Sequence, residues 1–240
     1  MDSISDIDLE LSQLNGIDIR ETSIENIHGY YKAKKFTCKE LVEYYLKRIE
    51  KLNPYLNTVI EVNKEAIKKA EELDQLFNEK GLVGSLFGIP ILAKDNIATY
   101  DTMQTTCGSM ALYDVKPKED ATVIKLIRAE NAIILGKVNM TEFAGFRDEI
   151  DPLGWSARGG QTCNPYVLSK HASGSSSGSA ASVAANLAVV SLGTETDGSI
   201  TAPSSTCSLV GLKPTVGLTS RAGVIPLSHN QDSVSCFVLK

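Results

Sequence analysis

The sequence predicts an α/β protein in which helices pack against a β-sheet, preceded by a helical N-terminal segment. From Gly88 onward, short apolar runs of strand length alternate with helical or glycine-rich stretches. This alternation is typical of helices that cover a sheet. With 240 residues, of which 42% are hydrophobic, the chain is long enough to bury a core. We interpret residues 1–240 as a single domain, with a helical part over residues 1–80 and an α/β part over residues 81–240.

Two pairs of residues with capping-box spacing predict where the first helices begin. The pairs are Thr22 with Glu25 and Thr37 with Glu40, each followed by apolar residues at helical intervals. Because the residue before a proline disfavours the helical conformation, we expect Asn53-Pro54 to end the second helix. A short strand over residues 58–62 and a third helix from about residue 63 should follow.

The α/β part should carry the chemistry, since glycine and hydroxyl residues concentrate there at the ends of predicted elements. Strands are expected at residues 89–93, 133–135 and 188–192, and helices at about residues 123–127 and 179–186. Residues 173–179 read SGSSSGS, which composition alone would make a flexible linker. Because they lead directly into an alanine-rich helix and a buried strand, we interpret them instead as part of the fold.

Composition and charge exclude several classes of protein. The formal net charge of −5 gives no electrostatic footprint for nucleic acid or an anionic membrane. No apolar run approaches the length of about 20 residues that a membrane-spanning helix needs. Five scattered cysteines, none in CxxC spacing, predict neither a disulfide framework nor a zinc site. We therefore expect a cytoplasmic protein that acts on a small molecule, with no metal and no cofactor.

A serine nucleophile is the candidate chemistry, and its base has to be found. Ser199 follows a predicted buried strand in the segment GTETDGSI (residues 193–200), where a tight turn could present its hydroxyl, although a plain turn serine is the simpler interpretation. Among the three histidines, His171 lies four residues before Ser175 but has no partner that the sequence can assign. Lys94 ends the apolar run 89–93 and could act as a base if burial lowered its pKa. The alternative is that Lys94 pairs with an acid such as Asp95.

Several separate motifs resemble those of the amidase signature family. They are Gly88-Ile89-Pro90 followed by Lys94-Asp95-Asn96, the segment 173–179 and the segment 193–199, with further similarity at residues 154–161 and 211–218. The resemblance covers about residues 20–234. It implies a mixed β-sheet covered by helices and a Ser-Ser-Lys mechanism without cofactor.

The resemblance also implies a role for each matching residue. Ser199 corresponds to the nucleophile, Ser175 to a bridging serine after a cis peptide bond with Gly174, and Lys94 to the base. The backbone N–H groups of Thr196, Asp197, Gly198 and Ser199 would form the oxyanion hole. Thr201 and Asp197 depart from the family, which often has arginine and glycine at these positions, and the departures leave the substrate open.

The predicted function is that of an amidase that hydrolyses a carboxylic amide to an acid and ammonia or an amine through an acyl-enzyme. The chain ends at Lys240, whereas the family continues with a further α/β segment, so we expect the C-terminal half of the family fold to be missing and activity to be impaired. The alternatives are a truncated inactive remnant, or a glutaminase-type subunit of a tRNA-dependent amidotransferase. The oligomeric state stays open, with a homodimer among the alternatives.

Overall fold

A six-stranded mixed sheet forms the centre of the fold. The structure, a computed structural model, describes residues 3–147 and 152–239. The strand order is β3-β5-β4-β8-β10-β9. These strands are β3 (Val59–Val62), β4 (Pro90–Lys94), β5 (Ile133–Val138), β8 (Val190–Glu195), β9 (Val210–Gly211) and β10 (Ser233–Val238). Strand β4 is parallel to β5 and β8, whereas the β3–β5, β8–β10 and β10–β9 pairs are antiparallel.

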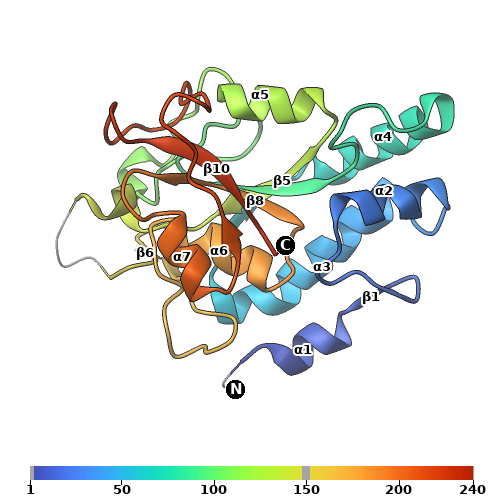
Figure 1. Cartoon of the computed structure of the whole chain (residues 1–240), viewed down its shortest axis with the longest axis horizontal. Coiled ribbons are helices and arrows are strands. Elements are labelled where there is room, and N and C mark those ends of the chain that lie inside the picture. Colours follow the sequence, from blue (N-terminus) through green and yellow to red (C-terminus); the bar gives the residue numbers. More distant parts are fainter. Residues whose placement is uncertain (1–2, 148–151, 240) are drawn as a thin grey trace.

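Helices cover both faces of this sheet, which confirms the predicted α/β class. The helices are α1 (Ser5–Glu10), α2 (Ile24–Lys32), α3 (Cys38–Leu56), α4 (Ala66–Lys80), α5 (Thr122–Ala129), α6 (Ser177–Ala184) and α7 (Thr201–Thr206). In Figure 1, α5 lies on one side of the sheet, and α3, α6 and α7 lie on the other. Helix α6 packs against β4, β8 and β10, so it lies across the strands that end near the candidate site.

Two short strand pairs and two 3₁₀ turns complete the architecture of the described residues. Strands β1 (Gln13–Leu14) and β2 (Ile17–Asp18) form a small hairpin, and β6 (Trp155–Ser156) pairs with β7 (Gly160–Gln161). Single turns of 3₁₀ helix cover Met110–Leu112 and Glu142–Gly145. The sequence did not predict α1 or the β1–β2 hairpin, because their apolar patterns are too short to show a period.

One of the two predicted capping boxes is present. Thr37 and Glu40 exchange side-chain and backbone hydrogen bonds at the start of α3, as predicted. The pairing of Thr22 with Glu25 was wrong, because Ser23 caps α2 by accepting the backbone N–H of Asn26. The cap therefore lies one residue later than expected, at a serine, which is preferred over threonine at this position.

The prediction that Asn53-Pro54 ends the second helix was also wrong. Helix α3 continues to Leu56, and Asn57 ends it in the left-handed conformation. A proline in the last turn removes only one intrahelical hydrogen bond. The Asn53 side chain also accepts the N–H groups of Thr58 and Val59, which orders the chain just beyond the helix.

Helix α6 is buried along its whole length, which explains its small side chains. Every residue from Ser177 to Ala184 is buried. A Cβ atom on Gly178 would lie 2.5 Å from the backbone nitrogen of Asn139 and 2.7 Å from the carbonyl oxygen of Thr58. The glycine-serine segment that precedes this helix is therefore packed in the interior, as its position in the sequence indicated, and is not a linker.

Candidate active site

Lys94 lies at the carboxyl end of β4 with its amine enclosed by hydroxyl groups. Its side chain is 0% exposed. Nζ lies 2.8 Å from Ser175 Oγ, 2.8 Å from Ser176 Oγ and 2.9 Å from Thr194 Oγ1. The Thr194 carbonyl oxygen, at 3.3 Å, is a further acceptor. The amine thus has several acceptors and no direct carboxylate partner among the described residues.

Asp95 points to the other face of the sheet, so it does not pair with Lys94. Its Oδ1 accepts a hydrogen bond from Arg158 at 2.7 Å, and its Oδ2 accepts from the Thr106 hydroxyl and the Gly108 N–H. Adjacent side chains alternate along a strand, which separates the two groups. The alternative interpretation, in which Lys94 is one half of an ion pair with Asp95, is therefore wrong.

Burial makes the Lys94 amine a potential base near neutral pH. Desolvation lowers its pKa from 10.5 to about 7, against the opposing influence of Cys107, Glu195 and Asp232. Burial favours the uncharged form of an amine because a charge is poorly solvated in the protein interior. A large fraction of Lys94 is then neutral at pH 7 and has a lone pair available.

The two serines continue a hydrogen-bonded chain from this amine. Ser175 Oγ and Ser199 Oγ are 3.0 Å apart, and the two residues are 2% and 4% exposed. Ser175 follows the only cis peptide bond in the described residues, which joins it to Gly174. Folding therefore brings together the three side chains that the sequence singled out, which lie 81 and 24 positions apart along the chain.

A buried carboxylate holds the turn that carries Ser199. Glu195, the last residue of β8, accepts the backbone N–H groups of Gly198 at 3.0 Å, Ile200 at 2.7 Å and Thr201 at 2.9 Å. One of the four N–H groups expected in the oxyanion hole, that of Gly198, is thus already engaged. The other expected donors, on Thr196, Asp197 and Ser199, lie in the same turn.

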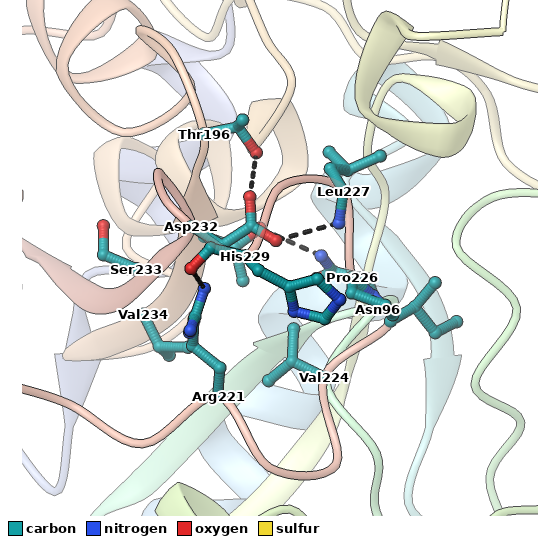
Figure 2. A pocket seen from close by; sticks show the side chains of 12 residues that line it. Asn96, Thr196, Arg221, Val224, Pro226, Leu227, His229, Asp232, Ser233 and Val234 are labelled. Carbon is teal, nitrogen blue, oxygen red and sulfur yellow. Dashed lines mark hydrogen bonds between the residues drawn. The ribbon is translucent and has the colours of Figure 1, made fainter. Parts of the chain in front are cut away.

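A second carboxylate, that of Asp232, connects this turn to the loop that contains residues 227–228. Asp232 Oδ1 accepts from the Thr196 hydroxyl at 2.6 Å, and Oδ2 accepts from the backbone N–H of Leu227 (Figure 2). Oδ2 also accepts from the backbone N–H of Ser228. Sequence reasoning assigned no role to Glu195 or Asp232, nor to Ser176 and Thr194. Ser176, Thr194 and Glu195 lie inside the quoted motifs, whereas Asp232 lies outside them. The contacts of Ser176 and Thr194 with Lys94, and of Asp232 with Thr196, join residues that are distant in sequence.

A cavity of about 290 Å³ lies beside the site. Figure 2 shows the His229 ring in this cavity, near Asn96 and Arg221. Its lining includes Thr194 and Thr196, so the cavity adjoins both the amine of Lys94 and the turn of Ser199. A small ligand could therefore approach from this side.

The histidines and cysteines do not join the chain of hydroxyl groups. His171 Nδ1 accepts the backbone N–H of Ser173, and His28 Nε2 contacts the carbonyl oxygen of Phe87. Burial raises the pKa of Cys163, which disfavours a thiolate. Within residues 3–147 and 152–239, no cluster of His, Cys, Asp and Glu side chains could hold a metal ion. No helix in the same ranges is both long enough and apolar enough to cross a bilayer.

Comparisons with known proteins identify the family. The model of the family named Amidase matches residues 40–239, and the chain therefore belongs to the amidase family. A protein of Arabidopsis thaliana named as a probable amidase is 53% identical over 218 residues, which are 90% of this chain and 43% of that protein. A glutamyl-tRNA(Gln) amidotransferase subunit of Clostridium acetobutylicum is 41% identical over 91% of this chain and 45% of its own length.

Solved structures lead to the same family. The peptide amidase of Stenotrophomonas maltophilia superposes with a TM-score of 0.89 at 46% identity, and covers 92% of this chain. The match covers 45% of the peptide amidase chain. This chain therefore spans less than half the length of the relatives it matches.

Proposed function

We propose that the chain carries the catalytic centre of a serine amidase that hydrolyses a carboxylic amide through an acyl-enzyme. The observation that supports this proposal is the hydrogen-bonded chain Lys94–Ser175–Ser199, with separations of 2.8 Å and 3.0 Å. A serine hydroxyl becomes a useful nucleophile only when a base takes its proton. A neutral Lys94 is that base, and Ser175, which can both donate and accept, carries the proton between them.

The reaction follows from these positions. Ser199 Oγ attacks the carbonyl carbon while its proton passes to Ser175 and the Ser175 proton passes to Lys94. The electron pair of the carbonyl double bond moves onto the oxygen, where the backbone N–H groups of Thr196, Asp197 and Ser199 stabilise it, since the Gly198 N–H is held by Glu195. When the C–N bond breaks, the proton returns through Ser175 to the leaving nitrogen. Water then releases the acid from Ser199 with the same proton transfers.

A fluorophosphonate probe tests the nucleophile directly. The Ser199 oxygen displaces fluoride from phosphorus, so the wild-type protein should be labelled and Ser199→Ala should not. Ser205→Ala is the matched control, because Ser205 is an exposed serine on α7 a few residues away. Labelling of Ser199→Ala at the wild-type rate would contradict the assignment. A wild-type protein that never reacts would instead support the inactive remnant.

The substrate is proposed from the relatives. The solved peptide amidase has 46% identity, so a peptide with a C-terminal carboxamide is the first substrate to test, with released ammonia as the readout. The second candidate is a glutaminase-type subunit, which the 41% identity to an amidotransferase subunit supports. Ammonia release from free glutamine, with none from peptide amides, would favour that second function.

A further inference from the structure

The partners of Lys94 restrict which hydroxyl can give it a proton. A neutral amine has two N–H bonds and one lone pair. Three hydroxyl oxygens, those of Ser175, Ser176 and Thr194, lie within 2.9 Å of Nζ. For the proton relay to work, the lone pair has to face Ser175 and the two N–H bonds have to face the other two hydroxyls. Something must therefore stop Ser176 and Thr194 from donating to the amine.

The hydroxyl proton of Ser176 is already committed. Ser176 Oγ donates to the carbonyl oxygen of Thr194 at 2.9 Å. A hydroxyl has one proton, so Ser176 can only accept from Lys94. Ser176 is fully buried, and water does not compete for this arrangement. One of the two N–H bonds of Lys94 is thus fixed on Ser176.

Asn96 fixes the direction of the Thr194 hydroxyl proton in a similar way. Asn96 Nδ2 donates to Thr194 Oγ1 at 3.0 Å, and Lys94 donates to the same oxygen at 2.9 Å. A hydroxyl oxygen has two lone pairs, and these two donors occupy both of them. The Thr194 proton then has to point in the remaining direction, away from Nζ. Without Asn96, the hydroxyl could rotate and donate to the lone pair of Lys94, in competition with Ser175.

The Asn96 carboxamide, which also lines the cavity beside the site, is poorly satisfied apart from its bond to Thr194. It is 2% exposed, and within the described residues its Oδ1 has no hydrogen-bond partner. A buried polar atom without a partner is unfavourable, so an amide kept only for packing would be better replaced by an apolar side chain. Among residues 3–147 and 152–239, the one hydrogen bond that the Asn96 side chain makes is to Thr194 Oγ1.

We propose that Asn96 is a positioning residue for the base: by donating to Thr194 Oγ1, it keeps the lone pair of the neutral Lys94 amine directed at Ser175. The inference rests on the proposed function, because it concerns the same proton relay. Asn96 acts through Thr194 and does not touch the nucleophile. The titratable groups that influence Lys94, namely Cys107, Glu195 and Asp232, are left in place when only Asn96 is changed.

The first experiment measures the rate of fluorophosphonate labelling between pH 5 and pH 9 in the wild-type protein and Asn96→Ala. We expect the plateau rate above pH 8 to fall by about threefold to tenfold, the range that one hydrogen bond is worth. The midpoint, which is the pH at which the labelling rate reaches half of its plateau, should stay near the wild-type value. A purely structural loss would hydrate the amine and raise the midpoint instead. Gln104→Ala is the matched control, because Gln104 is a buried amide whose Oε1 also has no partner in the described residues.

A double-mutant cycle tests whether Asn96 acts through Thr194. Thr194→Val removes the hydroxyl, so adding Asn96→Ala should slow labelling no further. Thr194→Ser retains the hydroxyl and should remain sensitive to Asn96→Ala. Independent, additive losses would overturn the proposal, as would an Asn96→Ala protein that is labelled at the wild-type rate at every pH.

Neutron diffraction from crystals of deuterated protein decides the same point without requiring activity. With crystals held above pH 8, where the amine is neutral, the proposal expects the Thr194 deuteron to point away from Lys94 Nζ and a deuteron of Asn96 Nδ2 to point at Thr194 Oγ1. A Thr194 deuteron on the line to Nζ would overturn it. If the wild-type protein is not labelled at all, the proposed function fails, and the neutron structure still accepts or rejects the role of Asn96.

Discussion

Burial of the Lys94 amine should make the free energy of unfolding depend on pH, and the substitution Lys94→Met should remove this contribution. The amine has an ordinary pKa of 10.5 in the unfolded chain and a pKa of about 7 in the folded protein. Between these values the unfolded state binds more protons than the folded state, so the free energy of unfolding rises with pH. Below the pKa of the folded protein, the full free-energy cost of burying the charged amine lowers the stability. This cost disappears as the pH approaches 10.5.

The magnitude follows from the size of the pKa change. Each pKa unit is worth about 1.4 kcal/mol, so burial of this amine costs about 5 kcal/mol at low pH. Between pH 7 and pH 9.5, linkage predicts a gain of about 3 kcal/mol for the wild-type protein relative to Lys94→Met, which has no titrating group at this position. Lys137, a second buried lysine whose pKa burial lowers to about 8, contributes equally to both proteins and cancels.

Urea unfolding followed by the fluorescence of Trp155, the single tryptophan, measures the effect. The free energy of unfolding should be compared for the wild-type protein and Lys94→Met at several pH values from 7 to 9.5. The difference between the two proteins should change steadily with pH in favour of the wild type. Parallel curves would refute the reasoning, because they would mean that Lys94 titrates alike in the folded and unfolded states.

Three further predictions follow from individual contacts. The rate of fluorophosphonate labelling of Ser199 should rise about tenfold per pH unit below pH 7 and level off above pH 8, because the neutral fraction of Lys94 changes in this way. A labelling rate that does not vary with pH would exclude Lys94 as the base. Gly178→Ala should lower the free energy of unfolding by at least about 2 kcal/mol in thermal unfolding, because the added Cβ would lie 2.5 Å from a backbone atom of Asn139. Gly29→Ala in helix α2 is the control and should be neutral or stabilising, because its added Cβ would have no atom within 4 Å. Arg48→Met should cost about 3 kcal/mol in urea unfolding, since it breaks the buried ion pair with Asp8 and leaves the carbonyl groups of Ala185 and Asn186, just after α6, without this donor. An unchanged midpoint would contradict this.

The sequence alone determined the class of fold and the identity of the three central side chains. Short apolar runs predicted the strands around β4, β5 and β8, because the length of an uninterrupted apolar run is a local property of the chain. Lys94, Ser175 and Ser199 could be selected because each lies in a recognisable motif. The start of α3 was predictable for the same reason, since a capping box needs only four consecutive residues.

Only the tertiary structure decided how these side chains are surrounded. The contacts of Ser176 and Thr194 with the amine join residues 82 and 100 positions apart, and no local pattern encodes such pairs. The carboxylate of Glu195 could have faced solvent, and only the fold of the following turn places three N–H groups around it. The pKa of Lys94 is likewise a property of its burial, because the free energy of a charge depends on everything that replaces water around it.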